Sequence, residues 1–273
     1  MSPAAATSDL LYVTDVGTNS VYAYTYPEGA LAGTLTGFDS PVRDCSDIAG
    51  NVYVTNTNAE TVLEYAHGGE SPIATFKDKG FLPVDCSVDP TTGTLAVTNY
   101  GPSGSNTGSV AIYPRAGKAP KVYRAANVQA YLFCAYDNSG NLYVDGLNDS
   151  YDFLLIELPK GATKFIRIKL HQSFSAWGGV QTTGDYVAIG DGSSTIYEFA
   201  IRGSKAIEKK AVALRHAVNV VQFWVGLSSF VAPDGPNGGD HDVGLWTPDG
   251  LLKKTIGKSS LKNPSGATVS IAK

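Results

Sequence analysis

Short runs in which apolar and polar residues alternate cover most of the chain, and they end at glycine, proline, aspartate or asparagine. Alternation with a period of two is typical of β-strands, and the residues that end the runs favour tight turns. The pattern therefore predicts an all-β protein of short strands. No apolar stretch approaches the roughly 20 residues that a membrane-spanning helix needs.

One strand pattern, first seen as LLYVTD from residue 10, returns five times along the chain. The six copies occupy residues 10–15, 51–56, 94–99, 141–146, 186–191 and 230–235, at intervals of 41 to 47 residues. A period of this length, built from short strands, is typical of β-propeller blades. Each period holds four strand patterns, for example at residues 51–56, 61–66, 73–76 and 82–89. We therefore expect a six-bladed β-propeller with four antiparallel strands per blade.

The fourth strand pattern of each period is the most apolar. It recurs at residues 41–48, 82–89, 131–137, 175–181, 220–227 and 264–272. We expect it to be the innermost strand, A, of the blade that follows, buried between neighbours. The last copy then has to join strands B, C and D from the start of the chain, which closes the ring and removes its open edges. This predicts a single domain over residues 10–273, preceded by an unstructured linker or tag remnant at 1–9.

Three repeats carry a resemblance to a known family. The segments GNVYVTN at 50–56, TGTLAVTN at 92–99 and SGNLYVDG at 139–146 resemble the NHL and YVTN groups of bacterial propeller repeats. The resemblance extends over residues 10–272 and is weakest in the copies at 186–191 and 230–235. It implies a six-bladed propeller that is exported. It implies little about activity, because such repeats occur in binding proteins, sensor ectodomains and enzymes.

Composition narrows the range of partners and locations. The formal net charge is −4, and lysine and arginine form no cluster, so we expect no nucleic-acid partner. Residues 2–8 (SPAAATS) are small and polar, like the segment that remains after a signal peptide is removed. We therefore expect a secreted, periplasmic or cell-surface protein whose signal peptide is missing from the sequence. We also expect a monomer.

The three cysteines, Cys45, Cys86 and Cys134, are separated by 41 and 48 residues, close to the repeat period. They should therefore occupy the same place in successive blades, which together with their odd number argues against a disulfide framework. We expect them to be buried, reduced and unreactive on the innermost strands. A contact between Cys45 and Cys86 of adjacent blades stays open.

By the family resemblance, the loops from strand D to the next A and from B to C share one face of the ring, here called the top face. The polar insertions at 100–108, 147–152 and 236–242 fall mostly there, so the top face is the expected ligand site. The candidate contacts are Tyr100, Asn106, Asn148, Tyr151, His171, His216, Asp240 and His241. The three histidines either converge from adjacent blades or remain separate, solvated loop residues. The expected function is a binding scaffold for a small molecule, glycan or protein.

The alternative is a metal-dependent hydrolase similar to six-bladed lactonases and esterases, in which calcium sits in the central channel. The positions before the first two cysteines would place Asp44 and Asp85 there, and the histidine group would suit zinc. The other positions of this set are mostly apolar, so we expect a mostly apolar channel and no cofactor. No G-x-S-x-G nucleophile motif occurs, so binding without catalysis is favoured.

Acidic or amide residues also recur where strand B ends. They are Asp15, Asn56, Asn99, Asp145, Asp191 and Asp234. Two interpretations remain open. A ring of oxygen donors would suit calcium, whereas Asp and Asn also cap turns by accepting hydrogen bonds from nearby backbone N–H groups.

Overall fold

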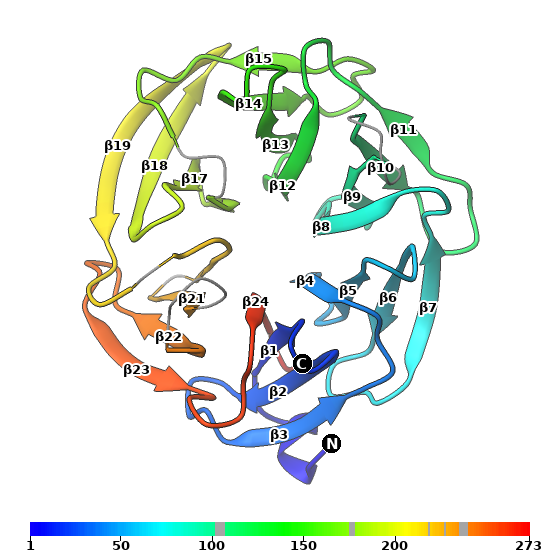
Figure 1. The fold of residues 1–273 in the computed structure, drawn as a ribbon, viewed down its shortest axis with the longest axis vertical. Helices are drawn as coiled ribbons and strands as arrows, with labels where there is room; N and C mark the ends of the chain where they lie inside the picture. Colours follow the sequence, from blue (N-terminus) through cyan, green and yellow to red (C-terminus); the bar gives the residue numbers. More distant parts are fainter. Residues whose placement is uncertain (102–106, 175–177, 218, 227, 235–239) are drawn as a thin grey trace.

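The computed structural model forms a ring of six four-stranded antiparallel sheets, called blades 1 to 6, around a central axis (Figure 1). The region that the six innermost strands surround is called the central channel. It describes residues 1–101, 107–174, 178–217, 219–226, 228–234 and 240–273. The sequence prediction of a six-bladed propeller is therefore confirmed. Among the described residues, no helix is both long enough and apolar enough to cross a bilayer.

Each blade is given from the channel outwards. Blade 1 contains β24 (Pro264–Ser270), β1 (Leu10–Asp15), β2 (Ser20–Thr25) and β3 (Leu31–Leu35), and blade 2 contains β4 (Pro41–Ser46), β5 (Val52–Asn56), β6 (Thr61–Tyr65) and β7 (Pro72–Lys77). Blade 3 contains β8 (Leu82–Val88), β9 (Leu95–Tyr100), β10 (Ser109–Tyr113) and β11 (Lys121–Tyr123), and blade 4 contains β12 (Ala130–Tyr136), β13 (Leu142–Leu147), β14 (Phe153–Leu158) and β15 (Ile166–Ile168). Blade 5 contains β16 (Val180–Thr183), β17 (Tyr186–Gly190), β18 (Thr195–Arg202) and β19 (Lys205–Ala213), and blade 6 contains β20 (Trp224–Val225), β21 (Phe230–Asp234), β22 (Asp242–Trp246) and β23 (Leu252–Ile256).

Blade 1 combines the two ends of the chain, as the sequence predicted. The C-terminal β24 pairs with β1 in antiparallel register, with Leu11 opposite Val269 and Val13 opposite Ala267. In Figure 1 the red β24 lies between the channel and the blue β1. Because the closing strand supplies the innermost position of blade 1, the inner edge of β1 is paired and the two ends of the chain are held together.

Residues 1–9 pack against blade 1. Pro3–Ala6 form the 3-10 turn η1, Ser2 N–H donates to the carbonyl oxygen of Ala32 at 2.6 Å, and Ala5 is only 1% exposed. The N-terminal ammonium also contacts the carboxylate of Glu70. The structure thus differs from the unstructured linker expected here, because Ala5 and the partly buried Met1 pack against the apolar cluster of blades 1 and 2.

Two of the cysteines are joined, which corrects the expectation that all three are reduced. Cys45 of β4 and Cys86 of β8 form a disulfide, with their Cα atoms 5.8 Å apart. The two cysteines occupy the same position in adjacent blades, which the sequence analysis took as evidence against pairing. In the structure, this equivalence brings them within bonding distance. Burial on inner strands is confirmed for all three, and Cys134 is a free, buried thiol.

The innermost strands of blades 5 and 6 are shorter than expected. β16 has four residues and β20 has two, against seven in β8 and β12. Near β16 the backbone comes very close to its neighbour, since a Cβ on Gly178 would lie 1.7 Å from the carbonyl oxygen of Gly190. Such close approach is available only to glycine, so the inner edge of blade 5 is formed differently from that of blades 2 to 4.

Candidate functional site

A top-face cavity of about 720 Å³ lies beside blade 4, between the loop that follows β13 and the segment that follows β15. Its lining includes two of the sequence-predicted contacts, Tyr151 and His171, together with Phe153, Lys169 and Phe174. Its size is within the range of small-molecule sites, about 300–1,000 Å³. Two residues of the insertion at 147–152, Tyr151 and Asp152, therefore line a cavity, and its role as a ligand site stays a prediction.

Tyr151 is held out into solvent by the turn that contains it. The side-chain oxygen of Asn148 accepts hydrogen bonds from Ser150 N–H and Asp152 N–H, both at 2.8 Å, and its amide donates to the Asp152 carboxylate at 3.0 Å. Tyr151 has a φ of +63° and is 70% exposed. A left-handed backbone is unfavourable for tyrosine, so the Asn148 cap holds an aromatic ring in a position that packing does not explain.

Aromatic side chains form the base of this cavity. The rings of Phe153 and Phe174 lie 5.3 Å apart, and Phe174 also meets the edge of Tyr197 at 5.3 Å. Phe174 is buried, whereas Arg167, Lys169 and His171 are exposed at the rim. The site thus combines an apolar base with two cationic side chains, Arg167 and Lys169, at its rim.

The other predicted top-face contacts are not brought into this cavity. His216 and His241 have φ values of +68° and +54°, as expected of turn residues, and neither lines it. Exposed Asp240 pairs with Lys258 at 2.9 Å. Asn106 lies outside the described residues. A pocket shared by His171, His216 and His241 therefore stays a prediction.

The polar residues at the ends of the B strands act mainly as backbone caps in the described structure. Asp15 accepts hydrogen bonds from the N–H groups of Thr18, Lys262 and Asn263, and Asp191 accepts from Ser193, Ser194 and Thr195. Asn56 likewise accepts from Asp39 N–H at 2.7 Å. These contacts favour the turn-capping interpretation of the repeat over a ring of calcium ligands.

The central channel is polar, contrary to the apolar channel expected from the sequence. Gln222, just before β20, donates to a carboxylate oxygen of Asp85 and to the carbonyl oxygen of Asp44, both at 3.3 Å. Its own side-chain oxygen accepts from Ala267 N–H at 3.0 Å. One buried amide therefore joins blades 6, 3, 2 and 1 across the ring.

Three carboxyl groups and one guanidinium are buried in this region. Asp85 accepts from Cys134 N–H at 2.9 Å, and Asp145 accepts from Phe133 N–H at 2.7 Å. Both carboxylate oxygens of Asp44 lack a hydrogen-bond partner among the described residues. The guanidinium of Arg43 lies 5.0 Å from the centre of the Phe133 ring.

Burial dominates the protonation of this group. It raises the pKa of Asp85 to about 7, although Cys134 N–H and Arg43 act in the opposite direction. Burial likewise raises the pKa of Asp44, with the Asp85 charge adding to the effect, and raises that of Asp145. Burial in the channel therefore favours the protonated, neutral form of these three carboxyl groups.

Tyr100 belongs to this region rather than to a top-face loop. It ends β9, is half-buried, and packs beside the apolar cluster of blades 4 and 5. Burial raises the pKa of its hydroxyl, with Arg43 and Asp145 as the charged groups near it. Sequence reasoning also missed Arg43 and Gln222. The available signal was a lone polar side chain inside an apolar inner-strand segment, as in VVQFWV around Gln222.

The donor set does not fit the metal centre of the hydrolase alternative. Calcium needs about six to eight oxygen ligands, whereas both oxygens of Asp85 and one of Asp145 already accept N–H donors. Within the described parts of the chain, no three His, Cys, Asp or Glu side chains are grouped so that they could hold a metal. No reaction step is therefore derived from Asp44, Asp85 or the histidines.

No family model matches the chain, and no curated protein matches it. Solved structures are similar in fold. A chain from the crystal structure of a nidogen/laminin complex has a TM-score of 0.77 and 12% identity, covering 97% of this chain and 100% of that chain. A functionally unknown protein from Desulfotomaculum acetoxidans DSM 771 has a TM-score of 0.64, 10% identity and coverages of 97% and 100%.

A protein of unknown function from Bacteroides caccae is similar as well, with a TM-score of 0.69, 10% identity and coverages of 97% and 99%. At such identities the likeness concerns the fold alone, because one fold carries many unrelated functions. The NHL or YVTN assignment therefore stays a prediction, and the chain is a six-bladed β-propeller.

Proposed function

We propose that this protein is a binding scaffold whose top-face cavity beside blade 4 takes an acidic, aromatic-containing segment of a partner protein. The observation that carries the proposal is Tyr151, an exposed ring held at positive φ by the Asn148 cap over a cavity with an aromatic base. Exposed tyrosines at cavity edges are frequent anchors in protein interfaces, because they combine a large apolar ring with a polar tip.

The charge of the rim supports the chemistry of the partner. Arg167, Lys169 and His171 line the cavity, and the Asp152 carboxylate already accepts from the Asn148 amide. A carboxylate on the partner would meet the cationic Arg167 and Lys169, while an apolar side chain of the partner covers Phe153 and Phe174. This arrangement favours an acidic segment over a basic one.

An extracytoplasmic location fits this role. The Cys45–Cys86 disulfide supports it, since disulfides persist mainly in oxidising compartments such as the periplasm and the cell exterior. A rigid ring cross-linked at its inner strands would present the same top-face loops under those conditions. We therefore place the scaffold in the cell envelope or outside the cell.

The test is selection of a displayed random-peptide library on the full-length protein, followed by binding measurements on the enriched peptides. We expect peptides in which Asp or Glu neighbours an aromatic or large aliphatic residue. Tyr151→Ala and His171→Ala should each weaken the binding of these peptides by about tenfold or more, which corresponds to about 1.4 kcal/mol. His216→Ala is the matched control and should leave binding unchanged. Failure to enrich such peptides, or equal binding by Tyr151→Ala, would contradict the proposal.

The hydrolase alternative has weaker support, because the channel donors do not fit a metal. It is checked with the same protein by assaying lactone and aryl-ester hydrolysis with and without EDTA. A binding scaffold predicts no turnover above the uncatalysed rate and no change in thermal stability in EDTA. Chelator-sensitive turnover that disappears in Asp44→Asn would instead establish the enzyme.

A further inference from the structure

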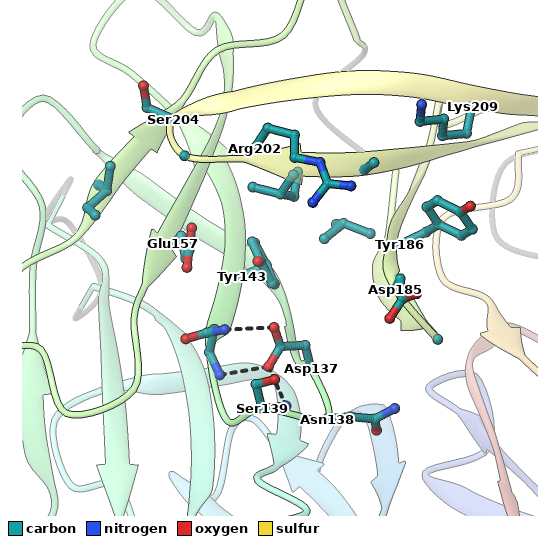
Figure 2. A pocket seen from close by; sticks show the side chains of 17 residues that line it. Asp137, Asn138, Ser139, Tyr143, Glu157, Asp185, Tyr186, Arg202, Ser204 and Lys209 are labelled. Carbon is teal, nitrogen blue, oxygen red and sulfur yellow. Dashed lines mark hydrogen bonds between the residues drawn. The ribbon is translucent and has the colours of Figure 1, made fainter.

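A second cavity, of about 960 Å³, opens on the face opposite the top-face loops, between blades 4 and 5. It is lined by the turn that joins β12 to β13, the turn that joins β16 to β17, and the end of the β18–β19 hairpin. Figure 2 shows Arg202 and Lys209 on the β18–β19 pair above the cavity, with Asp137, Tyr143 and Glu157 below it. None of these residues belongs to the top-face site.

Blade 5 forms one side of the cavity. In each blade, strand C presents a large side chain to the preceding blade, and in blade order these residues are Tyr24, Tyr65, Tyr113, Leu158, Phe199 and Trp246. In blade 3, Tyr113 is buried against Phe76 of blade 2, with ring centres 5.4 Å apart. In blade 5 the equivalent Phe199 is buried against blade 4, and Ala200, the next residue, lines the cavity.

The base of the cavity holds polar groups that blade 2 keeps occupied. In blade 2, the Tyr53 hydroxyl donates to the carboxylates of Asp47 at 3.2 Å and Glu64 at 3.1 Å. Tyr143 and Glu157 occupy the matching positions of blade 4, since Tyr143 pairs with Glu157 as Tyr53 pairs with Glu64. The Tyr143 hydroxyl makes neither hydrogen bond within the described residues.

Asp137 makes this base rigid. Its carboxylate accepts from Ser139 N–H at 2.9 Å, Asn141 N–H at 2.8 Å and the Asn141 amide at 2.8 Å. The turn is therefore held by its own hydrogen bonds, which Figure 2 shows as dashed lines. Glu157, by contrast, is a partly buried carboxyl that lines the cavity and accepts no hydrogen bond from the described residues. Its burial, and to a smaller extent the charge of Asp137, raises its pKa.

The walls combine aromatic and cationic groups. Tyr186 is 38% exposed, and Ile166 adds an apolar edge from blade 4. Arg202 and Lys209 form no ion pair within the described part of the chain. A ligand here would find a flat ring on one side, hydrogen-bond acceptors below and two free cations above.

We propose that this cavity binds a short acidic saccharide. The C–H face of a sugar ring matches the flat apolar face of Tyr186. Sugar hydroxyls both donate and accept, so they can donate to Glu157 and exchange hydrogen bonds with the Tyr143 hydroxyl and the Asn138 amide. A carboxylate on the sugar would reach Arg202, whose planar guanidinium suits bidentate contact with carboxylates. The site is independent of the top-face function.

The experiment is calorimetric titration of the purified full-length protein with a (1→4)-linked galacturonic acid trisaccharide. Maltotriose, a neutral trisaccharide, and citrate, an acid without sugar rings, are the comparison probes. The expected result is binding of the acidic trisaccharide at least tenfold tighter than either comparison probe. No binding of the acidic trisaccharide, or citrate binding as tightly, would overturn the proposal. Equal binding of maltotriose would overturn its acidic component.

Three variants place the binding in this cavity. Ala200→Tyr adds a ring at a residue that lines the cavity and should abolish binding by filling the space. Glu157→Gln replaces the free carboxylate by an amide with a single acceptor oxygen and should weaken binding of the trisaccharide at least tenfold. The matched change Glu64→Gln in blade 2 should not alter that binding. Arg202→Gln should reduce the preference for the acidic over the neutral trisaccharide. If Ala200→Tyr fails to fold, the Glu157→Gln and Glu64→Gln pair decides, and equal affinities for the two would overturn the site.

Discussion

Blades 2 and 4 have nearly the same local structure at the turn between their two innermost strands, yet only blade 4 opens there into a cavity. In both turns an Asp carboxylate accepts from the backbone N–H and the side-chain amide of an Asn four residues later, through Asp47 and Asn51 in blade 2 and Asp137 and Asn141 in blade 4. The intervening glycine is left-handed in each, with φ of +87° and +84°. The repeat thus forms the same turn twice.

The two blades differ in what lies beside this turn. In blade 2, the Tyr53 hydroxyl meets the carboxylate of Glu64, and the Tyr53 ring packs on Phe76, which also meets Tyr113 of blade 3. In blade 4, Tyr143 and Glu157 line a cavity together with residues of blade 5. The same structural motif therefore belongs to a closed interface in one blade and to a candidate site in another.

The largest expected effect concerns the cross-link that blade 2 has and blade 4 lacks. Replacing Cys45 and Cys86 together by Ala should lower the free energy of unfolding by about 4 kcal/mol, because the disulfide closes a loop of 41 residues in the unfolded chain. Denaturant unfolding of the oxidised protein and the variant measures this. Cys134→Ala, in the equivalent position of blade 4, should cost only about 1 kcal/mol for a small buried side chain. Equal losses would contradict a special role for the cross-link.

The next effect concerns the channel, where Asp44 of blade 2 and Asp145 of blade 4 lie near Asp85 and Arg43. Burial raises the pKa of Asp85 to about 7 in the folded protein, against about 3.9 in an unfolded chain. Folding then binds a proton, so the stabilisation is complete below about pH 4 and is lost as the pH rises through 7.

Asp85→Asn should therefore remove part of the decrease in unfolding free energy between pH 4 and pH 7. The measurement is the difference between the pH profiles of wild type and variant in denaturant unfolding. That difference separates Asp85 from carboxylates such as Asp89, whose pKa is lowered through hydrogen bonds although burial acts in the opposite direction. Parallel profiles would contradict a buried, protonated Asp85.

The smallest effect compares the two tyrosines directly. Tyr53→Phe removes a hydroxyl that donates to two carboxylates and should cost about 1–2 kcal/mol of unfolding free energy. Tyr143→Phe removes a hydroxyl without either bond and should change stability by no more than about 0.5 kcal/mol. Thermal and denaturant unfolding of the pair checks this. An equal cost at both positions would mean that the blade 4 copy is closed like that of blade 2.

Several features were accessible from the sequence because they depend on neighbouring residues. The repeat of LLYVTD-like segments predicted six blades, and the unpaired last strand predicted the pairing of β24 with β1. The polar insertion around Tyr151 predicted a top-face ligand site, which stays a prediction, and a cavity on that face includes Tyr151 and His171. Of the two interpretations of the recurring Asp and Asn at strand ends, the hydrogen bonds of Asp15 and Asp191 favour backbone capping.

Other features were not accessible. The Cys45–Cys86 disulfide depends on the distance between the inner strands of adjacent blades. The sequence showed only that the two cysteines occupy the same position in successive blades, not that their side chains face each other. The channel was expected to be apolar because most positions equivalent to Asp44 and Asp85 are apolar, and in blade 6 that position is Phe223. The polar side chain of blade 6 that reaches the channel is the preceding residue, Gln222. The cavity between blades 4 and 5 was not anticipated at all.

The sequence by itself determined the blade count, the strand pairing within each blade and the capped turns, because alternation and turn chemistry act over a few residues. Only the tertiary structure decided the disulfide, the buried channel carboxyls and the cavity between blades 4 and 5. Those features depend on side chains about 40 or more residues apart meeting across blade interfaces. Whether the space beside Tyr143 is filled or open is therefore a property of the packed ring.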